Sequence, residues 1–149
     1  MKISQAGIDL IKSFEGLKLN AYKCPAGIVT IGYGSTFYAD KSPIKMGDKL
    51  KDKIAAEELL KVTILTFEST INGLFYNVTL TQNQFDALVC FVFNIGPNAF
   101  AASTLLKKAK VNPNDKTIAL EFAKWVNAGG KKLPGLVKRR KAESDLYFM

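Results

Sequence analysis

The sequence predicts an α+β protein that is mostly helical, with a small antiparallel sheet near its N-terminus. Apolar residues recur at helical spacing between capping residues through most of the 149-residue chain. A β-prone stretch with glycine and proline turn signals occupies residues 17–37. The length fits a single domain, residues 1–149, with a small β-containing lobe at about 16–55 and a helical lobe at about 56–149 plus the N-terminal helix. A ligand cleft is expected between the lobes.

The N-terminal half is expected to contain a helix, a hairpin and a second helix. Ser4 is a favourable N-cap and Gly16 a favourable residue just beyond a helix C-terminus, so the first helix should end at Glu15. Pro and Gly at 24–27 separate two short β-prone segments and predict a hairpin turn. Apolar spacing across 54–71 predicts a longer helix that joins the lobes.

The C-terminal half is expected to be entirely helical. Thr81 is a candidate N-cap for a strongly apolar helix that stops before Gly96 and Pro97, and this helix should form the core of the larger lobe. Shorter helices are predicted at 103–109, 114–127 and 136–148.

Composition restricts the possible chemistry. Histidine is absent, which excludes Ser-His-Asp and Cys-His catalysis and histidine-based zinc sites. Cys24 and Cys90 are the only cysteines, so there is no disulfide framework or four-cysteine metal cage, and Cys90 fits a packing role. No cofactor or metal is expected. The net charge of +8 indicates attraction to nucleic acid, anionic lipid or a charged cell wall, or simply a soluble surface.

Several candidate motifs favour ordinary structural roles. Gly32 and Gly34 lack the third glycine of a dinucleotide loop because Phe37 stands in its place. The basic cluster 138–141 could contact a nucleic-acid backbone, but a solvated helix face is the favoured interpretation. Trp125 fits core packing. Five carboxylates are expected on solvated helix faces: Glu57, Glu58, Glu68, Glu121 and Glu143.

Glu15 differs from the other carboxylates in its position. A carboxylate in the last turn of a helix faces the negative end of the helix dipole, which tends to raise its pKa. A raised pKa suits a general acid near neutral pH. Taken singly, a helix-terminal glutamate is more often a plain surface residue, so the neighbouring sequence must decide.

That neighbouring sequence resembles the catalytic segment of the phage-type lysozymes, the endolysin muramidases of glycoside hydrolase family 24. Eight residues separate Glu15 from Cys24 and five separate Cys24 from Thr30, as in the Glu, Asp or Cys, Thr triad of that family. The flanking F-E-G-L-K-L-N-A-Y and T-I-G-Y-G are typical of the family as well. The similarity continues through 81–96 and L-P-G-L-V-K-R-R-K-A-E, so it covers nearly the whole chain.

The resemblance implies a lysozyme-like fold that cleaves the β-1,4 bond between N-acetylmuramic acid and N-acetylglucosamine in peptidoglycan. Glu15 would donate a proton to the leaving oxygen, and Cys24 and Thr30 would direct water from the opposite side of the sugar. The resemblance also implies five substrate-binding residues: Tyr33, Thr36, Phe93, Asn94 and Arg139.

Two positions depart from the commonest family pattern. Cys24 replaces aspartate, and an ordinary thiol is mostly protonated at pH 7. A nearby Glu15 charge is expected to raise the Cys24 pKa further, with Lys23 opposing it. We therefore expect a more alkaline pH optimum than an aspartate version would show. Ser35 stands where many relatives carry a structural histidine, which affects a local contact and not the reaction.

Other functions stay open on the sequence alone. A lytic transglycosylase would cut the same bond and release an anhydro sugar, and a non-catalytic wall-binding module or a basic nucleic-acid binder would cut nothing. By the resemblance, we expect a monomer that binds glycan strands and no nucleic acid. It would not insert stably into membranes, would accumulate in the host bacterial cytoplasm, and would reach the wall through a holin pore.

Overall fold

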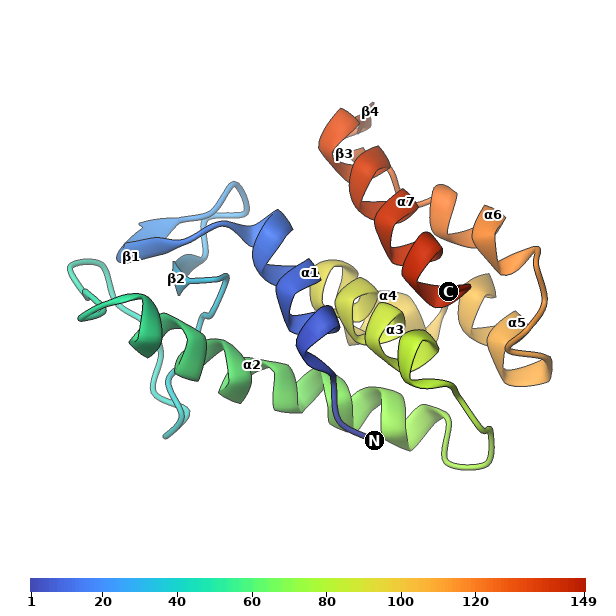
Figure 1. Ribbon diagram of the computed structural model, residues 1–149. Helices are drawn as coiled ribbons and strands as arrows, with labels where there is room; N and C mark the ends of the chain where they lie inside the picture. Colours follow the sequence, from blue (N-terminus) through green and yellow to red (C-terminus); the bar gives the residue numbers. More distant parts are fainter. The chain divides into compact units, whose positions relative to one another are not determined.

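The computed structural model describes residues 1–149, which form two compact units (Figure 1). We call residues 11–66 the hairpin unit, and residues 1–10 together with 67–149 the helical unit. The boundaries fall inside the two helices α1 (Gln5–Glu15) and α2 (Lys53–Leu74). The lobe limits expected near residues 16 and 55 therefore both lie within the hairpin unit.

The hairpin unit is built around one antiparallel strand pair, β1 (Lys18–Lys23) and β2 (Val29–Gly32), as the sequence predicts. Its core contains Ile31, Ile44 and Leu59, all buried. Half-buried apolar side chains pack against these three residues: Ala21, Val29, Tyr38 and Leu50. A small apolar cluster under one face of the hairpin holds this strand pair in place.

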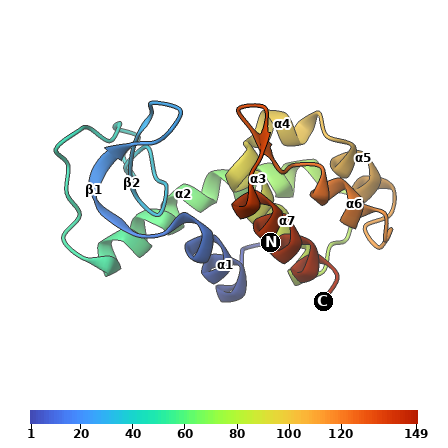
Figure 2. The same cartoon turned by 90° about the horizontal axis from the view of Figure 1, so that it is seen from above.

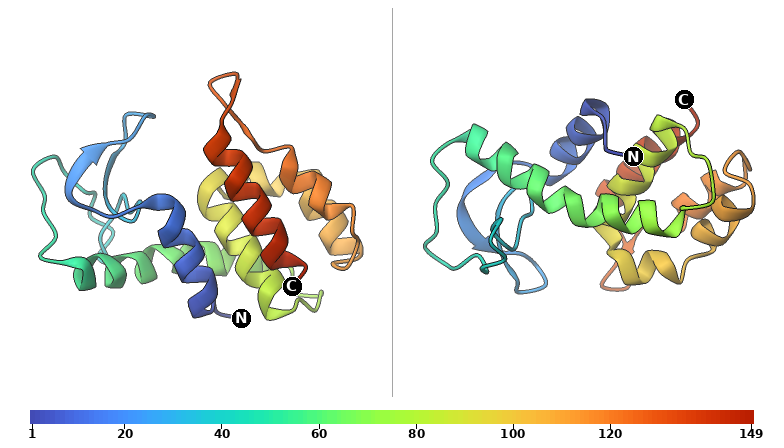
Figure 3. Two further views of the ribbon diagram at one scale, coloured as in Figure 1. Left: turned by 45° about the horizontal axis from the view of Figure 1, so that its top comes forward. Right: turned by 90° about the horizontal axis from the view of Figure 1, so that it is seen from below.

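The helical unit is centred on α3 (Gln82–Ile95), whose residues 84–92 are all buried. The predicted N-cap is confirmed, because the Thr81 hydroxyl accepts from the Gln84 N–H and the Gln84 side chain accepts from the Thr81 N–H. Helix α7 (Pro134–Tyr147) lies beside α3 (Figure 3). The ring of Phe91 packs edge-on against Phe100, Phe122 and Trp125, which confirms the core role expected for Trp125.

Short elements connect α3 to α7 in the helical unit. They are α4 (Pro97–Ala101), α5 (Thr104–Val111), α6 (Ile118–Ala123), β3 (Asn127–Ala128) and β4 (Lys131–Lys132). The expectation of an entirely helical C-terminal half is wrong, because β3 and β4 form a hairpin just before α7 (Figure 2). Gly129 and Gly130 both adopt positive φ, +57° and +75°, which a two-residue hairpin loop requires and a helix does not allow.

Several charged side chains are buried, contrary to the sequence interpretation. Glu68, Glu121 and Glu143 are only 7%, 4% and 0% exposed, so they do not lie on solvated faces. Arg139 and Arg140 are 5% and 1% exposed, so the solvated helix face expected for the basic cluster holds only for Lys138 and Lys141, which are exposed. Each buried carboxylate has partners; Glu68, for example, accepts from the N–H of residue 3 at 2.7 Å. Partnered burial is the usual condition for a charge inside a protein.

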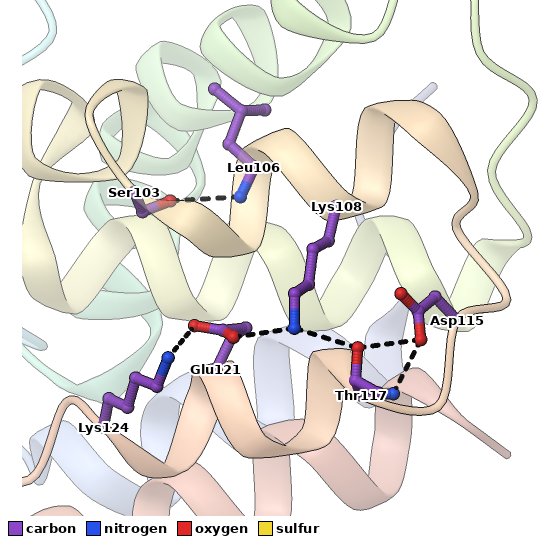
Figure 4. Close-up of polar contacts among 7 residues, drawn as sticks. All are labelled: Ser103, Leu106, Lys108, Asp115, Thr117, Glu121 and Lys124. Carbon is purple, nitrogen blue, oxygen red and sulfur yellow. Dashed lines mark hydrogen bonds and ion pairs between the residues drawn. The ribbon is translucent and has the colours of Figure 1, made fainter.

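Glu121 lies at the centre of a polar network that joins α5 to α6 (Figure 4). Its two carboxylate oxygens lie 2.9 Å from Lys108 Nζ and 2.7 Å from Lys124 Nζ. Lys108 also donates to the Thr117 hydroxyl at 2.9 Å, and that hydroxyl donates to Asp115 at 2.8 Å. Hydrogen bonding to Lys124 and then to Lys108 lowers the pKa of the Glu121 carboxyl.

We predict that Glu121→Gln destabilises the protein by about 1–3 kcal/mol at pH 7. The pKa of Glu121 is lower in the folded protein than in the unfolded chain. The carboxylate therefore stabilises the folded protein fully at pH values above its pKa in the unfolded chain. The stabilisation disappears as the pH falls through the folded value. Urea unfolding of the wild-type protein and of Glu121→Gln should be compared between pH 7 and pH 3. The difference between their free energies of unfolding should shrink below about pH 4. A difference independent of pH would contradict this role for the carboxylate.

Candidate active site

The β1–β2 hairpin carries two of the predicted catalytic residues, Cys24 in its turn and Thr30 in β2. The Cys24 N–H donates to the carbonyl of Ile28 at 2.9 Å, and the Gly27 N–H donates to the carbonyl of Cys24 at 2.8 Å. Gly27 adopts a φ of +80°, which closes the turn and favours glycine at this position. Thr30 is the cross-strand partner of Tyr22, so these two side chains share one face of the hairpin.

Thr30 is held in place beneath the turn. It is 5% exposed, and its hydroxyl donates to the carbonyl of Ile28 at 3.0 Å. The same carbonyl accepts from the Cys24 N–H, so the thiol residue and the hydroxyl residue are fixed to one backbone group. The hairpin therefore ties Cys24 and Thr30 to the same carbonyl.

The expected direction of the Cys24 pKa shift is wrong. Hydrogen bonding from the backbone of Ile28, and to a smaller extent from Ala26 and the Thr30 side chain, lowers the pKa of the thiol. Partial desolvation opposes this effect without reversing it. The turn thus stabilises a thiolate, and a Glu15 charge is not among the causes. Hydrogen bonds act at short range, so they can influence a pKa more strongly than a charge that lies farther away.

Glu15 is the last residue of α1 and is half-buried. The helix ends there because Gly16 takes a φ of +68°, while its N–H donates to the carbonyl of Lys12 at 3.2 Å. Burial, then the Glu15 carboxylate, then Cys24 raise the pKa of Tyr22. Glu15 and Cys24 therefore both act electrostatically on the same strand residue, and all three predicted catalytic residues belong to the hairpin unit.

Tyr22 is a site residue that the sequence reasoning missed. It stands two positions before Cys24 and directly opposite Thr30, and it is half-buried. Residues two apart in a strand point to the same face, so the strand register alone could have placed Tyr22 beside the triad. Its phenol is a neutral polar group next to the proposed reacting groups.

Lys12 holds the last turn of α1 against the rest of the hairpin unit. Its Nζ lies 2.5 Å from the Glu57 carboxylate on α2 and 5.6 Å from the centroid of the Tyr33 ring. This hydrogen bond to Lys12 is the main reason that the pKa of Glu57 is lowered. Because Lys12 precedes Glu15 by one helical turn, these contacts fix the end of the helix that presents Glu15.

The remaining hairpin-unit predictions fall just after β2. Tyr33 is only 4% exposed, so its ring packs inside the unit, while Thr36 is half-buried and its carbonyl accepts from the Ile44 N–H at 3.0 Å. Ser35 is fully buried, with its Oγ 2.7 Å from the hydroxyl of Thr63. This hydroxyl pair is the local contact that Ser35 makes in the structure.

The other three substrate-binding predictions belong to the helical unit. Phe93 packs against Phe67 with ring centroids 5.1 Å apart and a tilt of 51° between the rings, and Asn94 is exposed. The Asn94 side-chain oxygen accepts from Arg140 Nη2 at 2.7 Å. Arg139 is buried, and its Nε donates to Glu143 at 3.0 Å. The predicted site residues are therefore divided between the two units.

Comparisons with known proteins agree with the lysozyme-like fold that the sequence predicts. The phage lysozyme family model matches residues 12–143. An endolysin of Acyrthosiphon pisum secondary endosymbiont phage 1 is 45% identical, and the match covers 99% of this chain and 98% of that protein. An endolysin of Bacillus phage B103 is 44% identical, but the match covers 54% of it, so the chain spans about half of that relative.

A solved structure is similar over the whole chain. The muramidase domain of SpmX from Asticaccaulis excentricus is 38% identical with a TM-score of 0.87, covering 99% of this chain and 98% of that one. The fold and these similarities define a glycosidase of the lysozyme type. The chain belongs to the phage lysozyme family. A cell-wall-lysing lysozyme accounts for the matches better than a transglycosylase, a wall-binding module or a nucleic-acid binder.

No helix of the structure combines the length and apolar character that a membrane span needs.

Proposed function

We propose that this lysozyme hydrolyses the β-1,4 bond between N-acetylmuramic acid and N-acetylglucosamine, with Glu15 as proton donor and Cys24 with Thr30 as the water-directing pair. The observation that carries the proposal is the hairpin turn, which joins the thiol and the hydroxyl residue through one carbonyl and lowers the thiol pKa. Glycoside hydrolysis needs an acid for the leaving oxygen and a base or nucleophile across the sugar.

In the proposed reaction, the Glu15 carboxylic acid transfers its proton to the bridging oxygen while the bond to the anomeric carbon breaks. The Cys24 thiolate takes a proton from a water molecule that attacks the same carbon. The Thr30 hydroxyl can donate its one proton to the Ile28 carbonyl or to Cys24, and in either case its oxygen keeps lone pairs that can orient that water. The lowered pKa of Cys24 favours this hydrolytic route, because a thiolate is a far better base than a thiol.

Product analysis tests the reaction type. Purified peptidoglycan would be digested with the protein, and the soluble fragments would be weighed by mass spectrometry. We expect muramic acid with a free reducing end. A fragment lighter by one water would identify the 1,6-anhydro product and overturn hydrolysis in favour of a transglycosylase. Retention on the wall with no soluble fragment would indicate a binding module.

We predict that Cys24→Asp moves the acidic limb of the kcat/KM profile to lower pH. A thiol ordinarily has a much higher pKa than an aspartate carboxyl, so the variant should remain active further into acid even though the turn lowers the Cys24 pKa. A matched Cys24→Ser variant, which has no titrating group there, should lose most activity. An unmoved limb in Cys24→Asp would exclude Cys24 as the base.

We also propose that the protein acts as a monomer after it has accumulated in the host cytoplasm, and that a separate holin pore gives it access to the wall. The endolysin names of its relatives indicate lysis from inside the host, which fits accumulation there before the wall is reached. Expression in a host with and without a co-expressed holin tests it. Lysis that requires the holin supports the proposal, and equal lysis without one contradicts it.

A further inference from the structure

The two faces of the β1–β2 hairpin differ in what they contact. Ala21 and Val29 pack against the core residues of the hairpin unit, which include Ile31, so they lie on the face that points into the unit. Tyr22 and Thr30 are the next residues along the two strands and form a cross-strand pair, so they lie on the opposite face. Because Thr30 belongs to the proposed water-directing pair, we call this opposite face the reacting face.

The strand that carries Tyr22 is fixed along both of its edges. β1 pairs with β2 on one side, and on the other side the Ala21 N–H donates to the carbonyl of Asp48 at 2.9 Å. The Lys18 ammonium lies 5.8 Å from the centroid of the Tyr22 ring. β1 also follows closely on the end of α1, which presents Glu15 (Figure 1). A side chain on such a strand is well placed to hold a substrate in one position.

The hydroxyl of Tyr22 is an unused hydrogen-bond donor. It donates to no group of the protein, although the side chain is half-buried. A tyrosine hydroxyl usually has a partner when it is buried, as that of Tyr147 has in a carbonyl at 2.8 Å. Burial, then the charge of Glu15, then that of Cys24 raise the pKa of Tyr22. The phenol therefore keeps its proton at neutral pH and stays a donor beside the proposed acid and base.

We propose that Tyr22 is a substrate-positioning residue, whose hydroxyl donates a hydrogen bond to an oxygen of the N-acetylmuramic acid unit that is attacked. This inference rests on the proposed function, in which Cys24 and Thr30 direct water to the anomeric carbon of that sugar. Tyr22 lies directly opposite Thr30, so a sugar held there comes within reach of the phenol. A neutral donor suits this place, because a cationic donor would shift the pKa of the neighbouring acid and thiol.

Glycan binding to a catalytically impaired protein tests the contact directly. A soluble tetrasaccharide of alternating N-acetylmuramic acid and N-acetylglucosamine would be titrated by calorimetry into Glu15→Gln, with and without Tyr22→Phe. The second change removes the hydroxyl and keeps the ring. We expect the affinity to fall about three- to tenfold, the usual effect of losing one neutral hydrogen bond. Because the hydroxyl has no partner in the protein, the melting temperature should not fall.

The matched control is Tyr76→Phe. It removes a hydroxyl from a ring that is 81% exposed and belongs to the helical unit, so the affinity should be unchanged. Equal weakening by Tyr76→Phe and Tyr22→Phe would overturn the proposal, and so would an unchanged affinity in Tyr22→Phe.

Kinetics of the active protein separate a contact to the sugar from an effect on Cys24. Tyr22→Phe should raise KM by about three- to tenfold and leave kcat nearly unchanged, because the hydrogen bond is made equally to the substrate and the transition state. The limbs of the kcat/KM profile should stay at the same pH. A moved acidic limb with unchanged tetrasaccharide affinity would overturn the proposal and show that the hydroxyl acts through the thiol.

The binding measurement also separates this inference from the proposed reaction. A transglycosylase would bind the same glycan, so 1,6-anhydro products would refute hydrolysis while a weaker affinity in Tyr22→Phe still supported the contact. Absence of tetrasaccharide binding by Glu15→Gln with Tyr22 intact would contradict glycan recognition itself, and with it both proposals.

Discussion

Glu15→Gln should reduce the rate of peptidoglycan lysis by about 10²–10⁴-fold, because a positioned general acid contributes about that much to a rate. The amide keeps the size of the side chain but cannot protonate the leaving oxygen. The loss should appear in kcat, since wall binding by the cationic surface is retained. Release of soluble fragments from purified walls, measured alongside a wall-pelleting assay, separates the two quantities.

The matched control for this variant is Glu58→Gln. Glu58 is an exposed carboxylate of α2 whose partner is Lys61 at 2.8 Å, so its loss should leave lysis unchanged. Thermal unfolding should confirm that both variants are folded. Undiminished lysis by folded Glu15→Gln would remove Glu15 from the acid role and leave the chemistry without a proton donor.

Glu143→Gln should lower the free energy of unfolding by about 3–5 kcal/mol, the usual cost of removing one partner from a buried ion pair. Glu143 is 0% exposed and lies within 3.0 Å of Arg139 Nε and 2.9 Å of Arg140 Nε. The amide cannot balance two buried guanidinium groups. Urea unfolding at neutral pH should show a lower midpoint with an unchanged slope.

The same Glu58→Gln control calibrates this stability measurement. An exposed pair on a helix contributes about 0.3–0.5 kcal/mol, so the control should barely move the unfolding midpoint. A Glu143→Gln midpoint that matched the control would mean that the buried cluster adds no net stability. In that case solvent would have to reach the two arginines once the carboxylate is gone.

Local sequence patterns predicted most of the elements correctly. The first helix, the first hairpin, α2 and the capped α3 all follow from apolar spacing and from turn or cap residues that act over a few positions. The failures occurred where short elements depend on one backbone conformation. The β3–β4 hairpin requires two successive positive-φ glycines, and Pro97 starts the short helix α4 directly after α3 has ended.

The candidate site was predictable to a similar extent. Cys24 directly follows β1 and Thr30 lies in β2, so both belong to one short hairpin whose turn residues were recognisable in the sequence. The direction of the Cys24 pKa shift did not follow, because it depends on which backbone groups of the turn point at the sulfur. Tyr22 belongs to no recognised motif and was therefore missed, although its position in the strand register could have been inferred from the sequence.

By itself, the sequence determined the α+β class, the hairpin with its glutamate, cysteine and threonine spacing, and the lysozyme-like character, because each depends on residues close together in the chain. Only the tertiary structure decided which charges are buried. Glu68 accepts a hydrogen bond from a backbone group 65 positions away, and Arg140 donates one to an asparagine 46 positions away. A charge can leave water only when distant partners compensate its lost hydration, and local sequence carries no record of those partners.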